Sequence, residues 1–126
     1  MTSLPDQRTA TIVRGLYEAY RDRRRTDAEA LIAPDFRFTS PFDDAIDRAA
    51  FFARCWPNGD HIAAFEIERI AEDSDGAFVT YFCTAAEGAS FRNTEYLTVR
   101  DGKVTSVTVY FGASYRDGAF AGKPVD

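Results

Sequence analysis

The segment that most constrains the fold of this chain is residues 91–112, which has the pattern of a β-hairpin. Two stretches rich in β-branched and aromatic residues flank Asp101–Gly102, a dipeptide typical of hairpin turns. Because strand side chains alternate between two faces, Asn93 and Glu95 share a face with the apolar Leu97. A buried carboxyl group without a partner costs several kcal/mol or becomes protonated, and such groups are enriched at functional sites. We therefore predict that Glu95 belongs to a functional site.

Helical patterns occupy the first half of the chain. The first helix is predicted to begin at the Ser3–Asp6 capping pattern and to bury a stripe that ends at Tyr20. A second is predicted over 26–33, with Thr26 as its N-cap and Pro34 as its stop. A third is predicted to begin at Asp44 or Asp47 and to end before Pro57–Asp60.

Strand patterns occupy the rest. Asp35–Thr39 is predicted as a short strand, Ser40–Asp44 as a turn, and the residues from Arg116 onward as loosely ordered. Hairpin turn signals separate the later strands, which are predicted at 61–72, 77–87, 90–100 and 103–114. Helices followed by an antiparallel meander indicate an α+β fold, in which a curved sheet packs its concave side on the helices. The 126 residues fit one domain, 1–126.

Composition narrows the class of protein. A net charge of −5 and a pI near 4.9 argue against a nucleic-acid binder. The longest apolar run, Ala49–Ala53, is far shorter than the ~18 residues of a membrane helix, and no apolar signal segment is apparent, so we expect a cytoplasmic protein without a membrane partner. Cys55 and Cys83 lack metal-ligand spacing, and His61 is the one histidine. No metal site or cofactor is predicted.

Several segments, taken in order, resemble the NTF2-like superfamily and, within it, the SnoaL-like proteins. They are Leu16–Tyr17 with Tyr20, Ala30–Pro41, Cys55–Pro57, and Arg100–Lys103 leading to Val109–Gly112. The resemblance implies a cone-shaped fold with a pocket between the helices and the curved sheet, and a homodimer through the outer sheet face. It implies no single activity, because the superfamily includes isomerases, polyketide cyclases, epoxide hydrolases, dehydratases and non-catalytic binding proteins.

Ketosteroid isomerases, which are relatives in this superfamily, keep an acid on the penultimate strand protonated so that it donates a hydrogen bond to an oxyanion. Glu95 lies at about that place. Two other parts do not carry over: the general-base position corresponds to Ser40, and the first-helix tyrosine corresponds more closely to Leu16 than to Tyr17. The acid of epoxide hydrolase-like relatives is also missing from the last strand, 104–111.

Glu95 and Asp43 are the predicted proton-transfer residues, and Asn93 is a predicted hydrogen-bond donor to a carbonyl or enolate oxygen. The residues predicted to line an apolar pocket are Tyr17, Tyr20, Phe52, Trp56, Phe65, Phe82 and Phe111. Alternatives stay open. One is that Glu95 pairs with an arginine such as Arg92, Arg69 or Arg37, or faces solvent after a one-residue register shift. Another is that the aromatic residues simply fill the cone.

The leading hypothesis is a cofactor-independent isomerase, cyclase or dehydratase acting on a small hydrophobic carbonyl compound. A non-catalytic binder and a protein-interaction module with a filled cavity are the alternatives. The outward side of the final hairpin is rich in Thr and Tyr and lacks charge at its centre, which suits either a homodimer interface or an ordinary strand surface. Its residues are Thr94, Tyr96, Thr98, Ser106, Thr108 and Tyr110.

Overall fold

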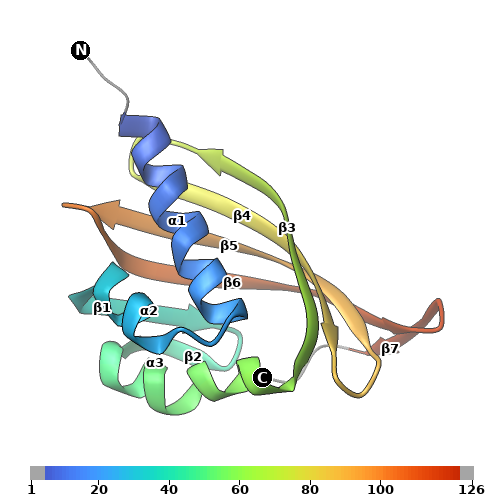
Figure 1. Ribbon diagram of the computed structural model, residues 1–126. Coiled ribbons are helices and arrows are strands. Elements are labelled where there is room, and N and C mark those ends of the chain that lie inside the picture. Colours follow the sequence, from blue (N-terminus) through green and yellow to red (C-terminus); the bar gives the residue numbers. More distant parts are fainter. Residues whose placement is uncertain (1–4, 123–126) are drawn as a thin grey trace.

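In the computed structural model, which describes residues 5–122, three α-helices pack on one side of a curved sheet (Figure 1). The helices are α1 (Pro5–Arg21), α2 (Arg25–Leu31) and α3 (Arg48–Arg54), and a 3₁₀ helix, η1 (Trp56–His61), follows α3. The α+β prediction is confirmed. Ser3 of the predicted capping pattern lies outside the described residues.

The caps of the two short helices differ from one another. Asp47 caps α3, because its Oδ1 accepts a hydrogen bond from the Ala50 N–H at 2.9 Å. The prediction that Thr26 caps the second helix is wrong. That helix begins one residue earlier, after Arg24, and its N-cap makes no side-chain hydrogen bond.

The sheet has the strand order β2-β1-β6-β5-β4-β3, and β7 pairs with β6 off this path. Its strands are β1 (Ile32–Ser40), β2 (Asp43–Asp47), β3 (Ile62–Glu72), β4 (Gly76–Ala85), β5 (Ser90–Arg100), β6 (Lys103–Arg116) and β7 (Ala119–Gly122). Among these described strands, β1 and β6 pair in parallel and the other pairs are antiparallel. The four strands predicted between residues 61 and 114 are all present.

Two strands lie where none was predicted. Residues 43–47 form an edge strand against β1 rather than a turn, and their side chains give no strand pattern because three of the five are acidic and only Ile46 is a large apolar residue. Residues 119–122 pair with the end of β6 instead of being loosely ordered. The signal for this hairpin is Asp117–Gly118, both of which have positive φ, as the turn requires.

The hydrophobic core lies between α1 and the concave face of the sheet. Val13 and Leu16 of α1 are buried against residues such as Val79 of β4 and Leu97 of β5. In Figure 1 the sheet curves around α1, which lies across its concave face. This curvature creates the space for a cavity.

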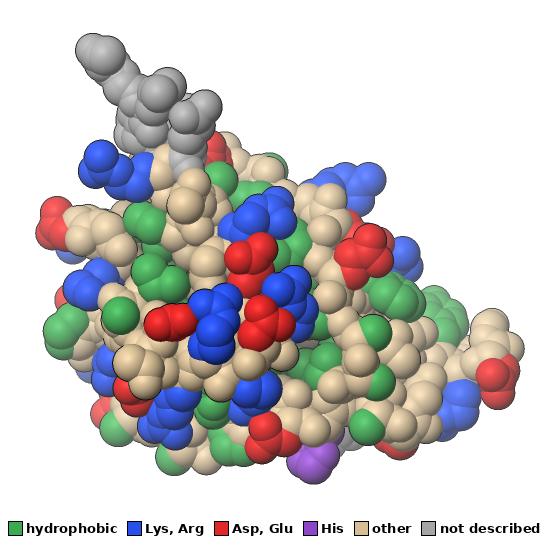
Figure 2. All heavy atoms as spheres, viewed as in Figure 1, with side chains coloured by type: hydrophobic (Ala, Val, Ile, Leu, Met, Phe, Trp, Pro, Cys, Tyr) green, Lys and Arg blue, Asp and Glu red, His purple; other side chains and the backbone are tan. Residues whose placement is uncertain are grey.

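The molecular surface carries intermingled charges. Ion pairs such as Arg24–Asp27 and Arg25–Glu29 lie along α2. On the face seen in Figure 2, basic and acidic side chains alternate, and the described residues there form no purely basic area. Within residues 5–122, no helix is both long and apolar enough to cross a membrane.

Candidate functional site

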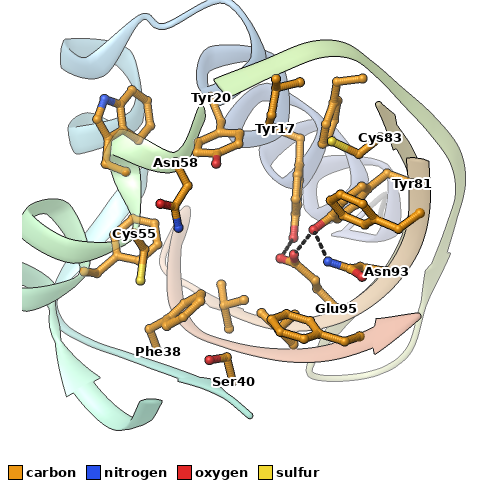
Figure 3. Close-up of a pocket in the computed structure, with 18 of the residues that line it drawn as sticks. Tyr17, Tyr20, Phe38, Ser40, Cys55, Asn58, Tyr81, Cys83, Asn93 and Glu95 are labelled. Atoms are coloured by element: carbon orange, nitrogen blue, oxygen red, sulfur yellow. Dashed lines mark hydrogen bonds between the residues drawn. The ribbon is translucent and has the colours of Figure 1, made fainter. Parts of the chain in front are cut away.

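A cavity of about 220 Å³ opens between α1, the α3–η1 segment and the concave face of the sheet (Figure 3). Its wall is mainly apolar and aromatic. The rings that line it include Tyr17, Tyr20, Trp56, Phe65, Tyr81 and Phe111. A largely apolar hollow with few polar groups is typical of small-molecule sites.

A cluster of three acidic hydroxyl and carboxyl groups lies on this wall, and we call Tyr17, Tyr81 and Glu95 the carboxyl cluster. Glu95 of β5 is 8% exposed. Its Oε1 is hydrogen-bonded to the Tyr17 hydroxyl of α1, and its Oε2 lies 2.5 Å from the Tyr81 hydroxyl of β4 (Figure 3). The antiparallel register sets Tyr81 opposite Asn93, so its ring reaches the carboxyl group of the next inward-facing residue.

Burial controls the protonation of this cluster. Loss of water around Glu95 raises the pKa of its carboxyl group, and the two tyrosine hydrogen bonds offset part of that rise. The pKa values of Tyr17 and Tyr81 are also raised well above 10, first by burial and then by the nearby Glu95. Burial therefore shifts all three groups toward their neutral, protonated forms.

None of the arginines considered as partners for Glu95 contacts it. Arg92 pairs with Glu68 at 2.9 Å on the other face of the sheet, and Arg37 donates to the Phe36 carbonyl. Within the described residues, the hydrogen-bond partners of Glu95 are the two tyrosines. Among the described residues, Glu95 is thus a buried acid without a compensating cation.

Asn93 is held in one orientation beside the cluster. Its Oδ1 accepts from the Gly112 N–H at 3.1 Å, and its Nδ2 donates to the Tyr81 hydroxyl at 3.1 Å. Gly112 can approach β5 this closely because it has no side chain: a Cβ there would lie 1.9 Å from the Arg92 carbonyl oxygen. Both amide ends of Asn93 are therefore used within the protein.

Asp43 supplies a second carboxylate to the wall of the same cavity. It is 5% exposed, and its Oδ2 accepts a hydrogen bond from Ser40 at 3.0 Å. Its Oδ1 lies 2.6 Å from Nη2 of Arg54, an ion pair without hydrogen-bond alignment. Asp43, unlike Glu95, is therefore a buried acid that is paired with a cation.

Five predicted lining residues are on the cavity wall: Tyr17, Tyr20, Trp56, Phe65 and Phe111. Phe82 is not, because strand alternation turns it to the opposite face from Tyr81, where its ring lies 4.8 Å from the Arg92 guanidinium carbon. Phe52 is not either. Successive helix residues point about 100° apart, so Phe51 faces the cavity and Phe52 packs under Arg25.

Sequence reasoning missed Tyr81. The available signal was that Val79, Tyr81 and Cys83 alternate along one predicted strand and so share a face. In the structure all three are buried. Their common face could be assigned to the cavity only through the pairing of β4 with β5, which links residues far apart in the chain. Burial raises the pKa of the Cys83 thiol to about 11, so it is a neutral part of this wall.

At one end of the cavity, the Arg23 guanidinium group packs on the rings of Tyr20 and Trp56. Its guanidinium carbon lies 5.2 Å from the Tyr20 ring and 4.5 Å from the Trp56 ring, and Arg23 pairs with Asp60 at 2.9 Å. The exposed His61 also borders the cavity. This end is therefore polar at the surface and aromatic inside.

Comparison with known proteins gives a family and a fold. A model of the SnoaL-like domain matches residues 13–107. An NTF2-like protein of unknown function from Burkholderia xenovorans has a TM-score of 0.72 at 15% identity, covering 98% of this chain and 90% of that one. A candidate ketosteroid isomerase from Kribbella flavida has a TM-score of 0.72 at 21% identity, covering 87% and 82%.

An NTF2-like protein of unknown function from Cytophaga hutchinsonii has a TM-score of 0.70 at 14% identity, covering 81% of this chain and 88% of that one. At such identities the likeness establishes the NTF2-like fold. A comparison with curated proteins finds no match.

Proposed function

Since the chain belongs to the SnoaL-like family, whose fold places a cavity inside a curved sheet, we propose that it binds a small, mostly apolar molecule with a carbonyl or enol oxygen. The observation that carries this proposal is the carboxyl cluster: a buried acid on an aromatic wall, bonded to two tyrosines and, among the described residues, to no cation. Such a cluster suits an oxygen that gains negative charge.

The size of the cavity limits the ligand. Drug-sized sites enclose roughly 300–1,000 Å³, and a cavity of about 150 Å³ takes benzene. The cavity here, at about 220 Å³, lies between these values. We expect a molecule of one or two rings rather than a steroid. An open cavity also favours a small-molecule binder over an interaction module with a filled interior.

Proton transfer is the second candidate function, and the presence of Asp43 on the same cavity wall favours it. The Asp43 carboxylate would take a proton from the carbon next to the ligand's carbonyl group. The electron pair of that C–H bond would move onto the carbonyl oxygen, where the carboxyl cluster stabilises the enolate. Return of the proton to the same or another carbon completes exchange or isomerisation without a cofactor.

Indanone and indane test both functions, because the two ring systems differ only in one carbonyl group. We expect both to shift the NMR signals of the cavity wall, with indanone bound about 2- to 10-fold more tightly, as one hydrogen bond worth ~0.5–1.5 kcal/mol provides. Binding of neither probe in the cavity would contradict the proposed ligand class.

Catalysis is measured separately, as protein-dependent deuterium exchange next to the indanone carbonyl in heavy water. We expect Asp43→Asn to slow it by about 10²- to 10⁴-fold while indanone still binds. Asp44→Asn is the matched control, because Asp44 is exposed and adjacent in sequence. Binding without exchange in the wild-type protein would leave a non-catalytic binder, and equal exchange rates in both variants would remove Asp43 from the mechanism.

A further inference from the structure

We infer that Asn93 is a positioning residue that sets the direction of the protons in the carboxyl cluster, so that this cluster offers the ligand one hydrogen-bond donor and selects an acceptor oxygen. The ligand class is thus a ketone, an enolate or a phenolate rather than an amine. This inference deepens the proposed function and rests on it. Its basis is the order of hydrogen bonds that runs from Gly112 to Tyr17.

The first bond fixes the orientation of Asn93. Because the Gly112 N–H can only donate, the Asn93 atom that faces it at 3.1 Å must be the carbonyl oxygen. The Nδ2 group therefore faces the Tyr81 hydroxyl and can only donate to it. A flipped amide would set two donors against one another at Gly112 and is excluded.

Tyr81 passes this direction to Glu95. Its hydroxyl oxygen already accepts from Asn93, and Asn93 offers it no acceptor in return. Among the described contacts of this hydroxyl, the one that can receive the Tyr81 proton is then the 2.5 Å contact with Oε2 of Glu95. Tyr81 is therefore the donor and Glu95 the acceptor in this hydrogen bond.

Counting protons shows what is left for a ligand. With Glu95 neutral, the carboxyl cluster holds three protons but contains only two oxygen–oxygen contacts, one to each tyrosine. Since the Tyr81 contact is already filled from Tyr81, the surplus proton lies on the Tyr17–Glu95 side. In one arrangement, Glu95 donates its proton to the Tyr17 oxygen, and the Tyr17 proton points into the cavity. In the other, Tyr17 donates its proton to Glu95, and the carboxyl proton of Glu95 points into the cavity. Both arrangements present one donor.

An ionised Glu95 presents none. Both tyrosine protons would then be held by the carboxylate, and the carboxyl cluster would offer the ligand only acceptors. Burial, which raises the pKa of Glu95, supports the neutral form. The other titratable groups on the cavity wall are Tyr17 and Tyr20 of α1, Tyr81 and Cys83 of β4, Cys55 and His61 at η1, and Asp43 at β2.

Asn93→Asp tests the inference because it changes one donor into an acceptor at nearly constant shape. The carboxylate introduced by this substitution would still accept from Gly112 and would now accept from Tyr81. Tyr81 could then accept the Glu95 proton, and Tyr17 would donate to Glu95, so that no proton remains for the ligand. We expect the several-fold preference for indanone over indane to fall to about 1.

Asn58→Asp is the matched control. Asn58 borders the same cavity but belongs to none of the hydrogen bonds of the carboxyl cluster (Figure 3). It should keep the wild-type preference, since it adds the same charge without redirecting protons. A preference that persists in Asn93→Asp, or that falls equally in Asn58→Asp, would overturn the inference.

A second measurement decides the matter if Asn93→Asp does not fold. In the wild-type protein the preference for indanone should disappear as the pH rises through the pKa of Glu95. In Glu95→Gln it should persist, because an amide N–H remains a donor at every pH. Equal pH dependence in both proteins would overturn the inference. Binding of neither probe to the wild type would instead be a failure of the proposed function.

Discussion

At the scale of single residues, Glu95 is the unusual feature of this molecule. Buried carboxyl groups are normally paired with a cation or a metal, whereas this one is bonded to two tyrosines whose hydroxyl groups are themselves buried. Strand alternation alone predicts that Glu95 and Asn93 point inward. The partners could not be predicted, because Tyr17 is 78 positions away in sequence and Tyr81 depends on the β4–β5 register.

The raised pKa of Glu95 has a consequence for stability. Between the ordinary value of 4.5 and its pKa in the folded protein, the folded state binds more protons than the unfolded state. The contribution of Glu95 to the free energy of unfolding is therefore fully present below pH 4.5, and it is lost as the pH rises through the pKa of Glu95 in the folded protein. Each unit of separation between the two pKa values is worth about 1.4 kcal/mol. Glu95→Gln removes the titration and should flatten this decline.

Urea unfolding of the wild type and Glu95→Gln at several pH values measures the effect. Exposed carboxylates whose pKa values are lowered, Asp22 and Glu68 among them, lose their stabilisation as the pH falls. They are the same in both proteins, so the difference between the two stability curves isolates Glu95. We expect the free energy of unfolding of Glu95→Gln to increase relative to that of the wild type as the pH rises. Parallel curves would show that Glu95 does not hold its proton in the folded state.

At the scale of helices and strands, prediction succeeded where one local signal was decisive. The hairpin turns and the alternation after residue 61 predicted four strands that are present. The last α-helix ends before Pro57–Asp60, as predicted, although these four residues belong to the 3₁₀ helix η1. Prediction failed where pairing decides. The edge strand β2 is stabilised by its hydrogen bonds with β1, not by an apolar pattern of its own. Phe82 was assigned to the cavity for its aromatic ring, although its parity with Tyr81 places it outside.

The start of α3 allows a direct test of local chemistry. Asp47→Ala removes the side-chain acceptor for the Ala50 N–H and should lower the free energy of unfolding by about 0.5–2 kcal/mol. Asp44→Ala is the control, because Asp44 is exposed on β2 and was the other predicted cap. Chemical denaturation of both variants compares them. An equal loss in the two would show that the cap at Asp47 contributes no specific stability.

At the scale of the whole molecule, the two faces of the sheet are unlike. The helices cover the concave face, and no described helix covers the convex face (Figure 1). That face carries Tyr110, which is 57% exposed, and Phe78, which is 42% exposed and packs on Tyr96 with ring centroids 4.6 Å apart. Hydroxyl pairs such as Thr80–Thr94, at 2.8 Å, fill the area beside them. A surface of this kind suits a self-complementary interface.

We propose that this convex face forms a homodimer, which leaves the cavity on the concave side of each subunit accessible. A stable interface of this type buries about 1,200–2,000 Å² in total, and a lysine at its centre would be desolvated without a partner. We therefore expect the wild type to sediment as a dimer and Tyr110→Lys as a monomer that still binds indanone. Tyr115→Lys is the matched control, because Tyr115 is 47% exposed and packs on Phe120 in the β6–β7 hairpin. A wild-type monomer, or equal dissociation of the two variants, would rule out this interface.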